Sequence, residues 1–313
     1  MNLAGADHED VPVPPPPLPL AAAVPAATLP VRDDLLYETK VDGWRVCVHG
    51  PAGVLHSRRP SDLTARFPDI LAAVQRLKGG AVLDGELVAY RPGGGLEFVP
   101  LTYSSRRRAA EGVALVFVAF DLLAWRGRDQ RGQPLHVRRA RLADLLGQPG
   151  GPVQLVGSTD DPATAAQWIS AEQAAVGIEG VVAKPTASTY PTRAKERSGW
   201  IKVKYSQTAE AVVLGVLGPI SAPTALVLGQ ADDNGTLHPI GLSAPLSRRA
   251  LASLAGRLRP IAGTPRIGGG LFGGEPRIYT PVQPDVEVEI HTDATRDLGR
   301  FRHRITVTNA KAP

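Results

Sequence analysis

The run Lys40-Val41-Asp42-Gly43-Trp44-Arg45 constrains this chain most, because it sets three charged residues inside a strand-like stretch from Leu36 to Val48. A lysine amine attacks an electrophilic phosphorus only when it is unprotonated, so it needs surroundings that lower its pKa or take its proton. Asp42 could orient such an amine or hold a metal ion beside it. The alternative is a hairpin in which Asp-Gly is the turn and Lys40 is a solvated residue.

Lysine is scarce in this chain, with seven lysines among 35 Lys and Arg residues. Where positive charge alone is needed the chain uses arginine, so a retained lysine indicates a position that needs a primary amine. Four of the seven lie in segments with other reactive residues: Lys40, Lys184, Lys202 and Lys204. The net charge of +5 and the pI near 9.5 favour a polyanionic partner.

Length and composition indicate a two-domain globular protein, since 313 residues with 43% hydrophobic side chains can fill two cores. Cys47 is the only cysteine, which excludes an internal disulfide and fits a reducing cytoplasm. Residues 1–30 are rich in Pro and Ala and are predicted to be a partly disordered lead-in, without the pattern of a signal peptide. No apolar run is long enough to span a membrane.

The predicted elements mix strands and helices without regular alternation, which favours an α+β fold over a doubly wound sheet. In a first domain, 31–206, strands are expected at 36–48, 54–57, 81–90, 115–123, 180–184 and 200–205, and helices at 62–77, 137–146 and 161–175. In a second domain, 207–313, strands are expected at 210–217, 225–230 and 286–291, with a hairpin turn at 234–235 and a helix at 247–258. About five strands and one helix match an OB-fold β-barrel.

Isolated carboxylates and alternating lysines follow along the chain. Glu86 and Glu179 each stand beside a glycine in an apolar strand, where a carboxylate can hold a ribose hydroxyl or Mg²⁺. Lys202 and Lys204 alternate with apolar residues and should share one face, where a phosphate between them would relieve their repulsion. Phe120 is a core residue or a platform on which a purine stacks. The run 106–108, three arginines, is a phosphate contact or a solvated loop.

Taken in order, these segments resemble the ATP-dependent DNA ligases, in the covalent nucleotidyltransferase superfamily. The likeness covers roughly residues 30–206 motif by motif, and it is nearest to the small bacterial repair ligases and to the ligase module of bacterial end-joining enzymes. It implies an adenylation domain with mixed and antiparallel sheets followed by an OB-fold domain. It also implies ATP rather than NAD as the nucleotide, with Mg²⁺ as the metal ion and Mn²⁺ as an alternative.

The resemblance implies a role for each of the motif residues. Lys40 would be the nucleophile that becomes lysyl-AMP. Glu86 matches a glutamate that holds the ribose or a metal ion, and Glu179 matches a metal-binding glutamate. Phe120 matches the aromatic that stacks on adenine, and Glu38 lies near the adenine edge.

Basic residues complete the implied site. Arg45 would contact the nucleotide sugar or a nearby phosphate, and Arg58 the nucleotide or the DNA 5′-phosphate. The residues matched to the surroundings of the α-phosphate are Lys184, Trp200, Lys202 and Lys204. In the second domain, alternating basic residues on one expected strand would orient the departing pyrophosphate: Arg300, Arg302 and Arg304. No proline follows His303, which departs from the family pattern.

The implied activity is the sealing of nicks in duplex DNA through lysyl-AMP and 5′-adenylated DNA, by a bacterial, cytoplasmic monomer that works in repair. Lys40, Asp42, Lys202 and Lys204 form the expected catalytic set. Two alternatives remain at this point. One is an RNA ligase or another covalent nucleotidyltransferase, and the other is a degenerate nucleic-acid-binding relative with little turnover.

Overall fold

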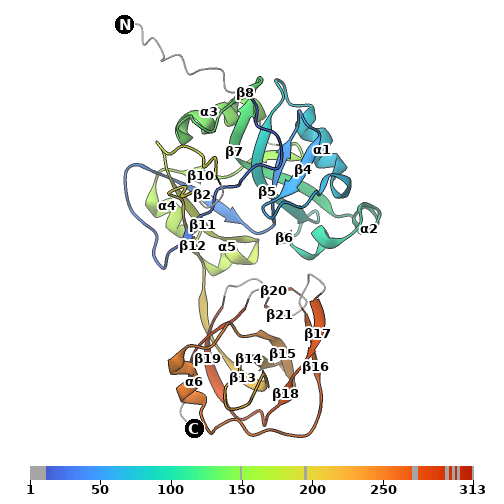
Figure 1. Cartoon of the computed structure of the whole chain (residues 1–313), viewed down its shortest axis with the longest axis vertical. Coiled ribbons are helices and arrows are strands. Elements are labelled where there is room, and N and C mark those ends of the chain that lie inside the picture. Colours follow the sequence, from blue (N-terminus) through green and yellow to red (C-terminus); the bar gives the residue numbers. More distant parts are fainter. Residues whose placement is uncertain are drawn as a thin grey trace. The chain divides into compact units, whose positions relative to one another are not determined.

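The computed structural model describes residues 12–148, 150–193, 196–269, 274–292, 296–297, 300–301 and 304–311. The chain divides into two compact units, Met1–Lys204 and Tyr205–Pro313. Each unit has its own sheets (Figure 1). Each also has its own hydrophobic core. This arrangement confirms the predicted α+β class, with mixed and antiparallel sheets and a β-rich C-terminal unit. In the described part of the chain, no helix is both long and apolar enough to cross a membrane.

The first unit contains a five-stranded sheet in the order β1-β12-β11-β2-β10. The neighbours are antiparallel except β1 and β12, which are parallel. Two short helices lie along this sheet, α4 (Pro162–Gln167) and α5 (Ala171–Ala175). The strands are β1 (Val24–Pro25), β2 (Leu35–Val41), β10 (Ser158–Thr159), β11 (Ile178–Pro185) and β12 (Ile201–Lys204).

A seven-stranded sheet forms the other half of the first unit, in the order β4-β3-β5-β7-β8, with β6 beside β5 and β9 beside β7. Its strands are β3 (Trp44–His49), β4 (Val54–Ser57), β5 (Val82–Tyr90), β6 (Leu96–Glu97), β7 (Ala114–Trp125), β8 (Arg128–Asp129) and β9 (Val153–Leu155). The helical segments beside it are η1 (Thr64–Arg66), α1 (Pro68–Gln75), η2 (Val99–Thr102), α2 (Ser105–Ala110) and α3 (Leu135–Leu146). Apolar side chains of α1 and α3 join the sheet in one core, which includes Ile70, Val74 and Leu142.

The chain changes sheets at Asp42-Gly43. β2 ends at Val41 and pairs with β10 and β11, whereas β3 begins at Trp44 and pairs with β4 and β5. The alternative of a hairpin turning at Asp-Gly is therefore wrong, because the two strands are not neighbours. The crossing brings Lys40, at the end of one sheet, close to the strands of the other.

Gly43 is required at this crossing because the backbone of β5 approaches closely. A Cβ at this position would lie 2.2 Å from the Leu87 carbonyl oxygen. We expect Gly43→Ala to lower the free energy of unfolding by about 1–3 kcal/mol, the usual cost of overpacking. Gly132→Ala is the matched control, since no atom lies within 4 Å of the added methyl group. Equal melting temperatures for the two variants would contradict this expectation.

Three of the expected helices are shorter than the sequence pattern indicates, and the one expected at 247–258 is α6 (Arg248–Leu254). The helix predicted at 62–77 is reduced to α1, preceded by a 3₁₀ turn, because Phe67 precedes a proline and is held out of the helical region. The single helix predicted at 161–175 is also wrong. Asp161 caps α4 as expected, but Ser170 has an extended backbone and caps a separate helix, α5, through its hydroxyl.

Residues 12–26, which we call the N-terminal strap, pack onto the first unit, whereas residues 1–11 of the predicted lead-in lie outside the described residues. Leu18 and Ala21 are buried in a small core with Cys47 and Trp200. The Leu18 N–H donates to His56 Nε2 at 3.1 Å. The strap then continues as β1, along the edge of β12.

The second unit is built on a six-stranded sheet in the order β15-β14-β13-β19-β22, with β18 beside β13. The edges of this sheet meet where Ser243 and Ile305 form a parallel bridge, so the sheet closes into a barrel as expected for an OB fold. Helix α6 (Arg248–Leu254) packs against β22. The sheet strands are β13 (Gln207–Leu217), β14 (Ala225–Ala231), β15 (Leu237–Leu242), β18 (Thr280–Pro281), β19 (Glu287–Thr292) and β22 (Thr306–Ala310).

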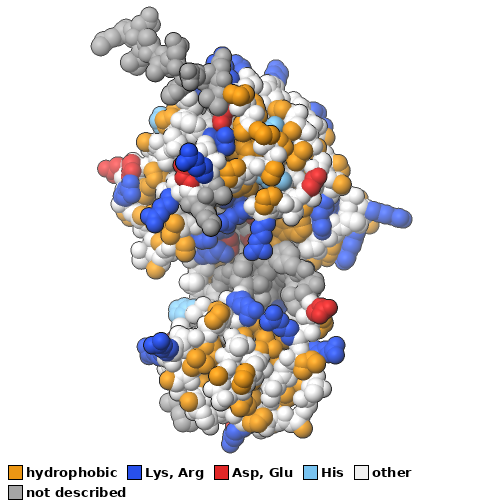
Figure 2. Space-filling view, viewed as in Figure 1, with side chains coloured by type: hydrophobic (Ala, Val, Ile, Leu, Met, Phe, Trp, Pro, Cys, Tyr) orange, Lys and Arg blue, Asp and Glu red, His pale blue; other side chains and the backbone are white. Residues whose placement is uncertain are grey.

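Two hairpins in the second unit were not predicted: β16 (Arg266–Gly269) with β17 (Gly274–Ile278), and β20 (Arg296–Asp297) with β21 (Arg300–Phe301). Arg300 and Arg304 do not share one strand, because β21 ends at Phe301 and β22 begins at Thr306. The expected strand with alternating arginines is therefore wrong. Arg302 lies outside the described residues. On the face seen in Figure 2, Lys and Arg side chains are spread more widely than Asp and Glu.

Candidate active site

Both sheets of the first unit supply the walls of a cavity of about 210 Å³. One group of lining residues comes from β2, β11 and β12, and another comes from β3, β5 and β7. The lining residues are Ala23, Glu38, Thr39, Lys40, Val41, Arg45, Arg58, Glu86, Phe120, Val182, Lys184, Trp200 and Lys202. Most of the residues that the sequence singled out are thus brought to one place.

An ion cluster joins Lys40 to Glu179 and Lys204 beside this cavity. Glu179 is buried, with one carboxylate oxygen on the Lys40 ammonium and the other 2.6 Å from Lys204 Nζ. β11 has an irregular register just after Glu179, where Gly180 lies against the backbone of Val203; a Cβ there would be 2.1 Å from the Val203 oxygen. This irregularity gives Glu179 its place between the two lysines.

The pKa of Lys40 is raised, not lowered, in this cluster. Burial acts to lower it, but the carboxylates of Glu179, Glu86 and Asp42 outweigh burial. Burial likewise raises the pKa of Glu179, and the two ammonium groups reverse that effect and lower it. The structure therefore does not supply a lowered lysine pKa, but it does place a carboxylate in contact with the Lys40 amine.

Arg45 and Glu86 face each other on β3 and β5 as cross-strand partners. Arg45 is bound to a different carboxylate, Asp84, through Nε at 3.1 Å and Nη2 at 2.6 Å. Its third nitrogen donates to the Ala21 carbonyl of the strap. Glu86 makes no hydrogen bond or ion pair with another described residue, and burial raises its pKa to about 7 although Lys40 and Arg45 act against this.

Two aromatic side chains in the cavity lining, Phe120 and Trp200, form what we call the aromatic wall, and the buried Lys184 lies between them. Lys184 Nζ lies 3.9 Å from the ring centroid of Trp200 and 4.6 Å from that of Phe120. It pairs at 2.6 Å with Glu38, which also takes Arg139 at 3.3 Å. The resemblance grouped Lys184 with the lysines around the α-phosphate. In the structure Lys184 lines the cavity and pairs with Glu38 in the aromatic wall, where burial lowers its pKa.

Lys202 and Arg58 supply positive charge that no described residue neutralises by a hydrogen bond or an ion pair. Lys202 is half-buried, and burial together with Lys40, Lys204 and Arg58 lowers its pKa. Two cations in the cavity lining without a described counter-ion form a site suited to phosphate oxygens.

The arginine run at 106–108 has a mainly structural role. Arg108 is buried, and its guanidinium donates to the carbonyls of Tyr103 and Arg66 at 2.5 and 3.0 Å. Arg107 pairs with Glu111 at 2.6 Å. Only Arg106 is left exposed without such a partner among the described residues, and the run lies on helix α2, not in a loop.

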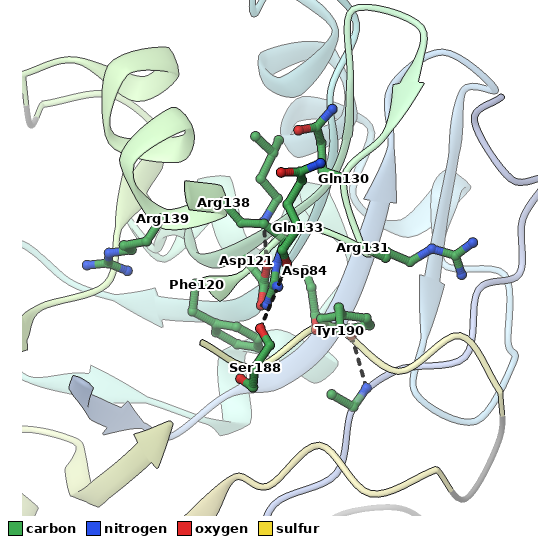
Figure 3. A network of polar contacts seen from close by, with 12 residues as sticks. Asp84, Phe120, Asp121, Gln130, Arg131, Gln133, Arg138, Arg139, Ser188 and Tyr190 are labelled. Carbon is green, nitrogen blue, oxygen red and sulfur yellow. Dashed lines mark hydrogen bonds and ion pairs between the residues drawn. The ribbon is translucent and has the colours of Figure 1, made fainter. Parts of the chain in front are cut away.

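Sequence reasoning missed a buried polar network behind the cavity (Figure 3). Asp121 and Arg138 form a fully buried pair, with Nε to Oδ1 at 2.7 Å and Nη2 to Oδ2 at 2.9 Å. Tyr190 donates to Asp84 at 2.5 Å. A signal was present, since an aspartate inside an apolar strand needs a buried partner. The sequence did not reveal which distant residue that partner is.

The arginines expected to act on the pyrophosphate belong to the second unit. Arg300 lies on β21 and is exposed, with Nη1 3.6 Å from the position that a Cβ on Gly268 would take. Arg304 donates to the Ser243 carbonyl at 2.9 Å, next to the bridge that closes the barrel. Arg304 is therefore tied to the barrel closure.

Comparison with known proteins identifies the family. Residues 20–204 match the family model described as "ATP dependent DNA ligase domain". The chain is 31% identical over 300 residues to DNA ligase C2 of Mycolicibacterium smegmatis, covering 85% of this chain and 83% of that protein. It is also 31% identical over 307 residues to DNA ligase C of Mycobacterium tuberculosis, covering 86% and 84%.

Solved structures of DNA ligases agree with this family assignment. The ligase domain of M. tuberculosis LigD is 26% identical, with a TM-score of 0.51 over 93% of this chain and 95% of that one. A Lig E DNA ligase shares the fold at 17% identity and the same TM-score, over 93% and 100%. The fold and the lysine-centred cavity define a nucleotidyltransferase with a C-terminal OB fold. The chain belongs to the ATP-dependent DNA ligase family and has ATP-dependent DNA ligase activity, as the sequence predicted.

Proposed function

We propose that this ligase seals nicks in duplex DNA through an AMP carried on Lys40. The observation that carries the proposal is the position of the Lys40 amine, which lies in the wall of the cavity and touches the buried carboxylate of Glu179. An amine beside a base and next to unneutralised cations has what nucleophilic attack on a triphosphate needs.

In the first step, Lys40 Nζ attacks the α-phosphorus of ATP. A nitrogen–phosphorus bond forms, the bond from the α-phosphorus to the bridging oxygen breaks, and pyrophosphate leaves. The amine loses a proton, which Glu179 is placed to accept. Lys202 and Arg58 stabilise the charge that develops on the phosphate oxygens.

In the later steps the same cavity holds AMP while DNA reacts. A DNA 5′-phosphate oxygen attacks the phosphorus on Lys40, which releases the amine and forms 5′-adenylated DNA. A 3′-hydroxyl then attacks the DNA phosphorus and displaces AMP. Phe120 is half-buried in the cavity wall and provides a ring for the adenine, and Glu38 lies in the same wall.

The carboxylates fit a Mg²⁺ ion that is held largely by phosphates. No group of three or more potential metal ligands occurs among the described residues. Mg²⁺ commonly takes one or two carboxylates together with substrate phosphates. Glu86, which has no described partner, and Glu179 would hold it, and the ion would supply positive charge to the phosphate oxygens.

Further aspects of the proposal come from the sequence and the family. We propose an adenylation domain over residues 31–206 and an OB-fold domain over 207–313, preceded by the N-terminal segment. We also propose a bacterial, cytoplasmic monomer that acts in DNA repair. Arg300 and Arg302 are proposed to orient the pyrophosphate during the first step.

Labelling with nucleotides tests the proposal. The chain is incubated with α-³²P-labelled ATP or GTP and separated on a denaturing gel. We expect a covalent band with ATP and none with GTP, and loss of the label when nicked duplex DNA is added. Retention of the label on nicked DNA together with its loss on nicked RNA would contradict a DNA ligase.

A further inference from the structure

Arg45 stands between two carboxylates that point to one face of β5. Its cross-strand partner is Glu86, and Cys47, two residues further along β3, faces Asp84. Side chains directly across an antiparallel pair are about 5 Å apart, so the guanidinium can reach either carboxylate. In the structure it binds Asp84 with two nitrogens and leaves Glu86 without a described partner. Something must therefore favour Asp84.

Tyr190 supplies that preference. Its hydroxyl donates to Asp84 Oδ2 at 2.5 Å and accepts the Ala21 N–H at 3.0 Å. Both side chains are buried, with Asp84 0% and Tyr190 2% exposed. Asp84 thus receives three donors from two residues, which fixes its carboxylate and orients Arg45. Figure 3 shows Tyr190 directly beside Asp84.

The same contacts connect the strap to the aromatic wall. The Tyr190 ring meets Trp200 edge-on, with centroids 5.9 Å apart. Arg45 lies 5.2 Å from the Phe120 centroid and 5.7 Å from that of Trp200. Holding Arg45 on Asp84 therefore also fixes the guanidinium against the two rings that line the cavity.

We propose that Tyr190 is a positioning residue, whose hydroxyl keeps Arg45 on Asp84 and so leaves the Glu86 carboxylate open to the ribose hydroxyls of the bound nucleotide. This inference rests on the proposed function, in which the cavity binds AMP and ATP. Without the hydroxyl, Asp84 loses a donor and the Ala21 N–H loses its acceptor. The Asp84 carboxylate is then no longer fixed in the orientation that accepts two Arg45 nitrogens, so Arg45 pairs with Glu86 and occupies the carboxylate that the nucleotide needs.

A double-mutant cycle on AMP binding tests this inference, because AMP binds without reacting. Dissociation constants are measured by calorimetry for wild type, Tyr190→Phe, Glu86→Gln and the double variant. We expect Tyr190→Phe to weaken AMP binding about tenfold, the size of one hydrogen bond to a buried charge. In the Glu86→Gln background the same change should have no further effect, since Glu86 is no longer there to be captured.

Tyr37→Phe is the matched control. Tyr37 is buried in the same unit, and its hydroxyl donates to the Pro30 carbonyl at 2.9 Å, with no described contact to Asp84. It should lower the melting temperature about as much as Tyr190→Phe and leave AMP binding unchanged.

The inference is overturned if Tyr190→Phe weakens AMP binding by the same factor in both backgrounds, if it does not weaken binding at all, or if Glu86→Gln binds AMP as wild type does. Failure of the proposed function is seen separately, as the absence of ATP labelling in the wild-type chain.

Discussion

Lys40→Ala and Lys40→Arg are both expected to abolish covalent labelling by ATP, with a loss of at least about 10⁴-fold, the scale of removing a catalytic nucleophile. Arginine keeps the positive charge next to Glu179, but its guanidinium does not deprotonate to a neutral amine. Both variants should remain folded, because Glu179 keeps its second partner, Lys204. The measurement is the gel assay with α-labelled ATP, together with thermal unfolding.

The specificity of this effect is checked with Lys78→Ala, which removes an exposed lysine of the same unit. It should label as wild type does. A persistent AMP band in Lys40→Arg would show that another residue is the nucleophile. Lys202 and Lys204 would then be the first to test, because both lie close to the same cavity.

Glu179→Gln should reduce the rate of labelling by about 10²–10⁴-fold, the usual contribution of a positioned base. The amide keeps the size of the side chain but neither accepts a proton nor balances the ammonium groups of Lys40 and Lys204. AMP binding should change much less, because the lost interaction acts mainly on the transition state. Single-turnover labelling and AMP calorimetry separate the two quantities.

Glu172→Gln, on the neighbouring helix α5, is the control for a carboxylate lost from the surface, and it should leave labelling unchanged. If Glu179→Gln weakened AMP binding and labelling by equal factors, Glu179 would have a structural role and no part in activating the amine.

The local pattern of the sequence was sufficient to predict most strands of the first unit. Lys202 and Lys204 were expected on one face because side chains alternate along a strand, and β12 carries both. The order of the motifs along the chain was sufficient to predict the family. The cavity brings together residues as far apart in sequence as Glu38 and Lys202.

Long-range contacts could not be predicted in the same way. Asp-Gly is typical of a hairpin turn, and only the pairing of β2 and β3 with different partners excludes one. Asp84 and Tyr190 are 106 positions apart, so no local pattern links them. The role of Asp84 as the partner of Arg45 follows only from the tertiary structure.

The predicted helix ends were wrong, although the sequence contained local signals for the correct ones. Proline after Phe67 and serine at 170 both mark helix starts, yet the apolar pattern runs across them and favoured longer helices. In each case the residue before the helix has a non-helical backbone. The local signal at the helix start therefore sets the boundary, and the hydrophobic periodicity does not.

The N-terminal strap determines where the first unit can be cut. The family match begins at residue 20, inside the strap, and the sequence alone favoured a start at 31. A truncated chain that begins at residue 31 would lose β1, expose the edge of β12 and uncover the small core around Trp200. It would also remove the Ala21 carbonyl that binds Arg45. Cloning, crystallisation or domain fusion of this unit should therefore keep the chain from residue 12 onward.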